Sequence, residues 1–305
     1  MSCWTACQPG AKRAADGELV VSSSSKLNLF LEVLAKRDDG FHELETVMVR
    51  TSFCDTLRLR VRADSRCTLR LSDTTASGFA KTVPLDETNL IIRAARTLQQ
   101  LTGCRNGVDI VLHKTIPPQA GLGGGSGNAA ATLLALRSLW EQSVSDRELH
   151  NMAAQLGSDV NFLLSDCRAA VCRGRGEEIH PVAIRGNWYF LAVRPSLGNA
   201  TAEVFSRCQI PERPRSSLKL TEHLQNGRVA AAQQYFFNRL TSGAVSCNPE
   251  MQRMMRKIAQ KPRRVVWMSG SGSTLFVAAM SFVEAQQIRT DLQQLLRRDV
   301  WLLRV

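Results

Sequence analysis

The stretch PPQAGLGGGSGNAA, residues 117–130, decides how this chain is interpreted. It holds five glycines and lies between a strand-like segment, 108–114, and an apolar helix predicted over 126–140. Glycine lets a backbone approach a ligand closely, and consecutive N–H groups at a helix start bind phosphate. A plain flexible turn is the alternative. Neither Walker A nor dinucleotide-binding spacing is present, so residues 117–127 form a candidate phosphate loop of another kind.

The rest of the chain mixes strand and helix patterns. Apolar and polar residues alternate over 25–33 and 56–62, which indicates strands, and 87–101 has helical periodicity. Ser145-x-x-Glu148 is a capping box that opens a further helix. Later helices are predicted near 221–240, 249–260 and 282–296, and later strands at 188–193, 264–268, 274–279 and 300–305. This order predicts an α+β protein with an extension, 1–20, and two domains, 21–180 and 181–305.

Composition narrows the function classes. Lysine and arginine number 39 against 27 acidic residues, a net charge of +12 that suits an anionic partner such as nucleic acid or a phosphorylated small molecule. The nine scattered cysteines lack zinc-site spacing and indicate reduced thiols. No apolar run approaches the ~18 residues of a membrane span, and the N-terminus lacks a secretory pattern. We expect a cytoplasmic protein that binds no membrane.

Four ordered segments carry a resemblance to a known family. Residues 117–129 resemble the phosphate loop, P-x3-G-L-G-G-G-S-S-N-A, of the galactokinase, homoserine kinase, mevalonate kinase and phosphomevalonate kinase (GHMP) superfamily, with Gly127 where a second serine is usual. SKLNLFL at 25–31 with RDDGFHEL at 37–44, and GSDVNF at 157–162, resemble the 4-diphosphocytidyl-2-C-methyl-D-erythritol kinases, with Asn161 replacing a proline. SGSGSTLF at 269–276 is similar to the superfamily's third motif. The resemblance spans about residues 22–280.

The resemblance implies a two-lobed fold, with a ribosomal-protein-S5-like N-terminal lobe and a ferredoxin-like C-terminal lobe. It implies transfer of phosphate from ATP, with Mg²⁺, to the 2-hydroxyl of 4-diphosphocytidyl-2-C-methyl-D-erythritol, a step of the non-mevalonate route to isoprenoid precursors. The partners would be ATP and this small molecule, with no nucleic acid, in a monomer or weak homodimer. ATP would lie on Pro117, Pro118, Gln119, Ala120, Gly121, Leu122, Gly123, Gly124, Gly125, Ser126 and Gly127.

Lys26 and Asp159 are the predicted catalytic pair. Lys26 shares a strand face with Asn28, and two polar residues on a leucine-rich strand indicate a lined cavity rather than a solvated lysine. We place Asp159 in the first turn of a short helix capped by Ser158, where an acid also complements the helix dipole. By resemblance Asp159 is the general base, and Lys26 orients it and the acceptor. Ser126 is either the N-cap of the helix after the loop or a contact of Mg²⁺ and the terminal phosphates.

The remaining candidates bind the two substrates. By resemblance Phe41 stacks on the cytosine and His42, in a loop, hydrogen-bonds its edge, although a lone surface histidine is usually inert. Phe205 would be the opposing aromatic, with Thr201 before it, and Asn28 would also contact the acceptor. Asn89 is equally well explained as a helix cap or as an adenine contact. The alternative functions are a homoserine or mevalonate type kinase and, from another class, an RNA-binding protein of the same N-terminal fold.

Overall fold

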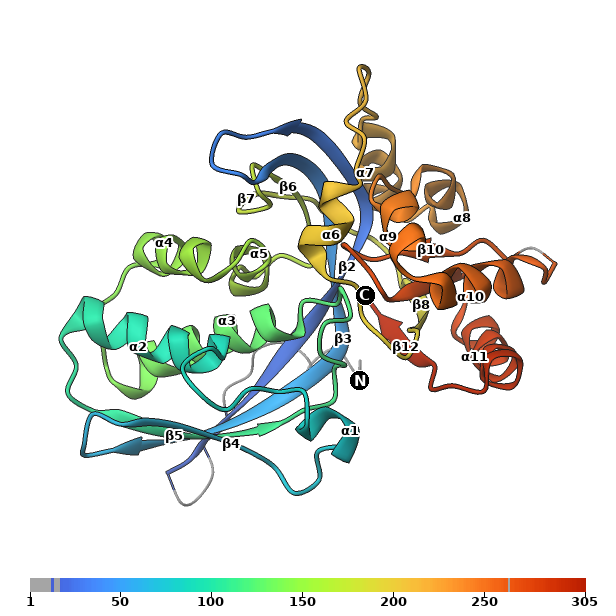
Figure 1. Cartoon of the computed structure of the whole chain (residues 1–305). Coiled ribbons are helices and arrows are strands. Elements are labelled where there is room, and N and C mark those ends of the chain that lie inside the picture. The colour runs from blue at the N-terminus through green and yellow to red at the C-terminus, as the bar shows by residue number, and fades with distance from the viewer. Residues whose placement is uncertain (1–11, 14–16, 263) are drawn as a thin grey trace. The chain divides into compact units, whose positions relative to one another are not determined.

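The computed structural model describes residues 12–13, 17–262 and 264–305 (Figure 1). Contacts divide the chain into two units. The first comprises Met1–Ser25, Phe53–Pro118 and Gly123–Asp166, and the second comprises Lys26–Ser52, Gln119–Leu122 and Cys167–Val305. Two long strands run through both units, β2 (Leu19–Lys36) and β3 (His42–Arg62). The predicted extension, 1–20, lies largely outside the described residues, and the predicted domain boundary at 180 stays a prediction.

The first unit combines a sheet with helices. The last residues of β3 pair antiparallel with β5, β5 pairs in parallel with β4, and β1 pairs with the start of β2. Helix α2 packs against α3 and β4 (Figure 1). The elements that belong to this unit alone are β1 (Lys12–Arg13), β4 (Cys67–Leu71), α1 (Ser77–Ala80), α2 (Leu90–Thr102), β5 (Gly107–His113), α3 (Gly124–Leu139), α4 (Asp146–Leu156) and α5 (Val160–Leu164).

Local sequence explains most of these elements. Leu57 and Leu59 of β3 are fully buried, while Arg58 and Arg60, which follow each of them, are exposed, as the alternating pattern predicts. Helix α2 ends at Gly103, whose φ of 65° is left-handed and therefore suits glycine. The capping box at the start of α4 is present with both of its hydrogen bonds. Helix α3 begins at Gly124, two residues before the predicted start.

The second unit contains a four-stranded antiparallel sheet in the order β10-β11-β8-β12. This is the strand order of a ferredoxin-like β-α-β-β-α-β unit, so that prediction is confirmed. Helix α11 packs on β8, β11 and β12. The elements are β6 (Ala169–Arg173), β7 (Glu178–Pro181), β8 (Tyr189–Val193), α6 (Thr201–Ser206), α7 (Leu218–Gln225), α8 (Val229–Ala232), a 3-10 helix (Gln233–Tyr235), β9 (Phe237–Asn238), α9 (Thr241–Cys247), α10 (Pro249–Ala259), β10 (Trp267–Met268), β11 (Leu275–Ala279), α11 (Phe282–Leu296) and β12 (Trp301–Arg304).

The second unit also shows where local patterns fail. The helix predicted near 221–240 is broken into α7, α8, the 3-10 helix and the short strand β9, which pairs in parallel with β2. Helices α6 and α9 were not predicted. The core draws on distant segments, among them Leu31 and Val33 of β2, Leu191 of β8, Met251 of α10 and Ile288 of α11. Within the described part of the chain, no helix has the length and apolarity needed to cross a membrane.

Candidate functional site

Lys26 is buried in β2 and held by Asn28. Both side chains are 2% exposed, and the Lys26 ammonium donates to Asn28 Oδ1 over 2.6 Å. Asn28 Nδ2 donates to Thr46 Oγ1 over 2.8 Å, and the Thr46 hydroxyl in turn donates to the Phe30 carbonyl. This chain of donors orients the Asn28 amide with its oxygen toward Lys26. The predicted placement of Lys26 and Asn28 on one strand face is therefore confirmed, although both faces of the strand are buried.

The segment 119–122 of the candidate phosphate loop belongs to the same unit as Lys26 and is anchored by its carbonyl groups. Three consecutive carbonyls accept hydrogen bonds. The Ala120 carbonyl accepts from Thr274 N–H over 3.1 Å, and the Leu122 carbonyl accepts from Lys26 N–H over 2.9 Å. Between them, the Gly121 carbonyl accepts from the Ser269 hydroxyl over 3.0 Å. The backbone is packed tightly here, because a Cβ on Gly121 would lie 2.4 Å from the Ser269 carbonyl oxygen. The third glycine-rich motif, predicted only as a family signature, thus supports the loop.

The loop backbone alternates in handedness. Gln119, Gly121 and Gly123 have φ values of 52°, 73° and 69°, while no positive φ occurs at Ala120 or Leu122. A backbone that alternates between right-handed and left-handed residues turns successive N–H groups toward one side, where they can bind an anion. The φ signs of residues 119–123 are therefore compatible with an anion-binding backbone, and their contact with phosphate stays a prediction.

In the first unit, the loop leads into the 16-residue helix α3. Its N-cap is Gly123, and Ser126 is the third helical residue, so the interpretation of Ser126 as the N-cap is wrong. The N–H groups of the first turn have no intrahelical partner and suit an anion. Gly127 has no room for a side chain, since a Cβ there would lie 2.4 Å from the Ser24 carbonyl oxygen and 2.8 Å from Ser23 Oγ. The absence of the second serine usual in the superfamily matches this packing.

A buried ion pair lies beside the start of α3. Asp55 is fully buried and accepts from the Lys114 ammonium over 2.5 Å and from the N–H groups of Thr115 and Ile116 over 2.7 and 2.8 Å. Burial lowers the pKa of the Lys114 ammonium, and Asp55 opposes that shift. A Cβ on Gly124 would lie 3.1 Å from Lys114 Nζ. Sequence reasoning missed this pair, because Asp55 and Lys114 lie 59 positions apart and no local pattern connects them.

Asn89 and Asp159 also belong to the first unit. Asn89 Oδ1 accepts from Ile91 N–H and its Nδ2 donates to the Pro84 carbonyl, which confirms it as the cap of α2 and leaves the adenine contact a prediction. Asp159 is half-buried at the N-cap position of α5, one residue before the helix rather than in its first turn, so Ser158 is not the cap. Asn161 Oδ1 lies 3.0 Å from His150 Nδ1, a contact that the usual proline lacks.

Two of the predicted acceptor residues in the second unit, His42 and Phe205, lie with their rings in contact. Their ring centroids are 4.9 Å apart and the ring planes are tilted by 31°. The Arg175 guanidinium lies 4.8 Å from the centre of the Phe41 ring. The structure thus brings His42 to Phe205, while the proposed sandwich of Phe41 and Phe205 stays a prediction. Thr201 begins α6 and its hydroxyl lies 3.0 Å from that of Ser271.

His42 differs from its prediction in its place in the fold. It is the first residue of β3 rather than part of a loop. Burial lowers the pKa of its imidazole, and the nearby Lys36 lowers it further. A neutral imidazole offers one donor and one acceptor, which is what reading a base edge requires.

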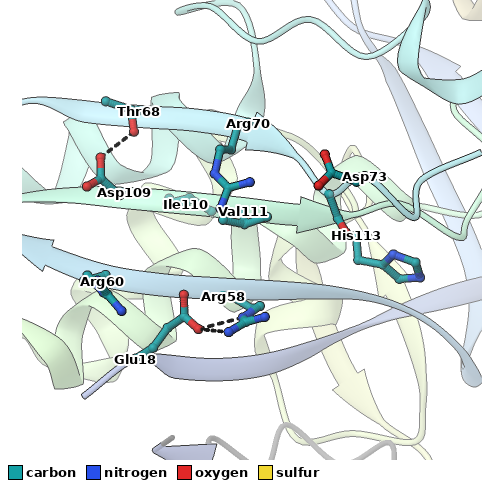
Figure 2. A pocket seen from close by; sticks show the side chains of 11 residues that line it. Glu18, Arg58, Arg60, Thr68, Arg70, Asp73, Asp109, Ile110, Val111 and His113 are labelled. Atoms are coloured by element: carbon teal, nitrogen blue, oxygen red, sulfur yellow. Dashed lines mark hydrogen bonds and ion pairs between the residues drawn. The ribbon is translucent and has the colours of Figure 1, made fainter. Parts of the chain in front are cut away.

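A groove of about 510 Å³ on the sheet of the first unit bears on the nucleic-acid alternative (Figure 2). Figure 2 shows Arg58 of β3 joined to Glu18, which directly precedes β2, and Thr68 of β4 joined to Asp109 of β5. The charged lining of the groove consists of three arginines and three carboxylates: Arg58, Arg60, Arg70, Glu18, Asp73 and Asp109. These charges balance, whereas a nucleic-acid surface is strongly positive. The groove therefore gives the RNA-binding alternative no support.

Comparison with known proteins places the chain in a family. Residues 89–174 match the GHMP kinases N terminal domain. A 4-diphosphocytidyl-2-C-methyl-D-erythritol kinase of Acidovorax sp. is 38% identical over 84% of this chain and 86% of its own, and one of Mycolicibacterium gilvum is 36% identical over 90% and 86%. A crystal structure of 4-(cytidine 5'-diphospho)-2C-methyl-D-erythritol kinase is 31% identical with a TM-score of 0.74, covering 93% of this chain and 98% of that one.

A homoserine kinase from Cytophaga hutchinsonii has a TM-score of 0.70 at 16% identity, covering 95% of this chain and 96% of that one, and shares the fold alone. The mixed α+β, GHMP-type fold is thereby confirmed. With identities of 36–38% over most of its length, the chain belongs to the 4-diphosphocytidyl-2-C-methyl-D-erythritol kinase family of the GHMP superfamily.

Proposed function

We propose that this protein transfers the γ-phosphoryl group of ATP to the 2-hydroxyl of 4-diphosphocytidyl-2-C-methyl-D-erythritol. The observation that carries the proposal is the anchoring of residues 119–122 to Lys26 and to the third motif, since a phosphate loop must hold its N–H groups fixed. Family membership supports the choice of acceptor. The homoserine and mevalonate alternatives have only fold-level likeness.

The residues take the following roles. Residues 117–127 cradle the ATP phosphates with backbone N–H groups, at the start of a 16-residue helix. Asp159 accepts the proton of the acceptor hydroxyl as its oxygen attacks the γ-phosphorus and the bond to the β-phosphate oxygen breaks, leaving ADP. Lys26 orients the acceptor. Phe41, His42 and Phe205 bind the cytosine, with Thr201 and Asn28 as further acceptor contacts.

Mg²⁺ fits this site through Ser126, whose hydroxyl lies in the first turn of α3. Among the described residues no group of three His, Cys, Asp or Glu side chains could hold a metal by itself. In phosphoryl-transfer sites Mg²⁺ usually binds through one or two protein ligands together with substrate phosphates, so such a group is not required. When bound, the ion would neutralise charge on the phosphates. Location in the cytoplasm and a monomer or weak homodimer stay predictions.

Turnover on an acceptor panel tests the proposal. Purified protein, ATP and Mg²⁺ are incubated separately with the cytidyl substrate, mevalonate and homoserine, and ADP release is measured. We expect turnover with the cytidyl substrate alone. Turnover with mevalonate or homoserine instead would show that the proposed acceptor is wrong. Salt-sensitive RNA binding without ATP turnover would show that the protein is not a kinase.

A further inference from the structure

We infer that Ser269 is a positioning residue that couples the phosphate loop to Lys26. The inference rests on the proposed function, because it assigns a part to Ser269 within that same site. Ser269 lies in the third glycine-rich motif and is fully buried, and its hydroxyl lies 3.1 Å from Asn28 N–H and 3.0 Å from the Gly121 carbonyl. No candidate role was assigned to it from the sequence.

The hydrogen-bond directions at Ser269 are determined by its partners. Asn28 N–H can only donate, so Ser269 Oγ accepts there. The single hydroxyl proton then has two acceptors within reach, the Gly121 carbonyl at 3.0 Å and Asn28 Oδ1 at 3.4 Å. Asn28 Oδ1 already accepts from the Lys26 ammonium at 2.6 Å. The shorter contact, at 3.0 Å, directs the proton to the Gly121 carbonyl.

Ser269 therefore joins two elements that catalysis must keep in register. On one side is the strand residue whose amide holds the Lys26 ammonium. On the other is the carbonyl of Gly121, the middle one of the three anchored carbonyls, where the backbone has a left-handed φ of 73°. The neighbouring carbonyls are held by backbone N–H groups, which an alanine substitution does not remove. Ser269 is thus the one side-chain link among the three described anchors.

The same motif supplies a matched control. Ser273 is also fully buried, yet among the described residues its hydroxyl has no hydrogen-bond partner. Ser269→Ala and Ser273→Ala each remove one buried oxygen from one motif, but only the first leaves a backbone N–H and a carbonyl without a partner. An unpaired buried polar group costs ~1–3 kcal/mol, so the expected effect is a roughly 5- to 150-fold loss of the property that Ser269 supports.

Steady-state kinetics and ATP titration of the full chain test the role. For Ser269→Ala we expect kcat to fall roughly 5- to 150-fold and ATP affinity to fall, with KM for the cytidyl substrate near the wild-type value. Ser273→Ala should keep all three, and Ser269→Thr should restore kcat because it restores the hydroxyl. Equal losses in both alanine variants, or wild-type kcat and ATP affinity in Ser269→Ala, would overturn the inference.

The proposed function and the role of Ser269 can fail separately. If wild-type protein binds ATP but phosphorylates none of the three acceptors, the acceptor assignment fails. ATP affinity of the two alanine variants then decides the role of Ser269, since binding needs no acceptor. Weaker ATP binding in Ser269→Ala alone supports the link to Gly121, and equal binding in both variants contradicts it.

Discussion

Asp55 and Lys114 form an ion pair, 2.5 Å between Oδ2 and Nζ, in which both side chains are almost wholly removed from solvent. Lys114 follows β5 directly, and Asp55 also accepts the N–H groups of the next two residues. The carboxylate therefore fixes the backbone of residues 114–116, which leads from β5 toward the candidate phosphate loop. A charge buried in this way is stable only while its partner is present.

Lys114→Met should destabilise the fold by ~3–5 kcal/mol, the usual cost of leaving one charge of a buried pair without its partner. The free energy of unfolding in urea measures it. Lys219→Met is the control, because Lys219 pairs with Glu222 on the surface of α7 and such pairs contribute only ~0–1 kcal/mol. Similar losses in both variants would mean that burial of the Asp55 pair has no energetic consequence.

Gly127→Ala should disturb the start of α3, whereas Gly125→Ala should not destabilise the protein. A Cβ at 127 meets the Ser24 carbonyl at 2.4 Å, while one at 125 has only an ordinary 3.7 Å contact with Leu90. Overpacking of this kind typically costs ~1–3 kcal/mol. Thermal unfolding of both variants checks the difference, and a Gly127→Ala protein as stable as wild type would show that the strand and helix separate easily.

Asp159→Asn should keep the fold and ATP binding and lower kcat by ~10²–10⁴, the range for loss of a general base. Asp166→Asn is the control, an exposed aspartate just after α5 whose loss should leave kcat unchanged. Phosphorylation of the cytidyl substrate at saturating concentrations of both substrates measures the effect. Near wild-type turnover by Asp159→Asn would remove this residue from the mechanism.

Binding of the cytidyl substrate should depend on pH through His42. Its pKa is lowered mainly by burial, so the imidazole stays neutral down to below its ordinary value of ~6.5. KM should be constant at higher pH and rise only below that value, as the acceptor nitrogen is lost. The same shift makes His42 destabilise the fold as the pH falls from its unfolded toward its folded pKa. In His42→Gln the change in KM with pH should vanish; if it persists, another group titrates.

The sequence by itself determined the elements that depend on near neighbours in the chain. The capping box of α4, the alternation of Leu57 and Leu59 in β3, the bounds of α11 and the glycine pattern of the loop all follow from periodicity, caps and backbone freedom. The nucleotide-binding character of residues 117–127 was predicted for the same reason, because glycine spacing before an apolar helix is a local signal. Family membership followed from four such segments in order.

Only the tertiary structure decided the contacts between segments far apart in the chain. Ser269 meets Asn28 across 241 positions, and Lys114 meets Asp55 across 59, at distances that no local pattern encodes. The break-up of residues 221–240 has the same origin, since β9 forms by pairing with β2 rather than by its own propensity. Most buried polar groups have a hydrogen-bond partner, and the fold alone determines which partner lies within reach.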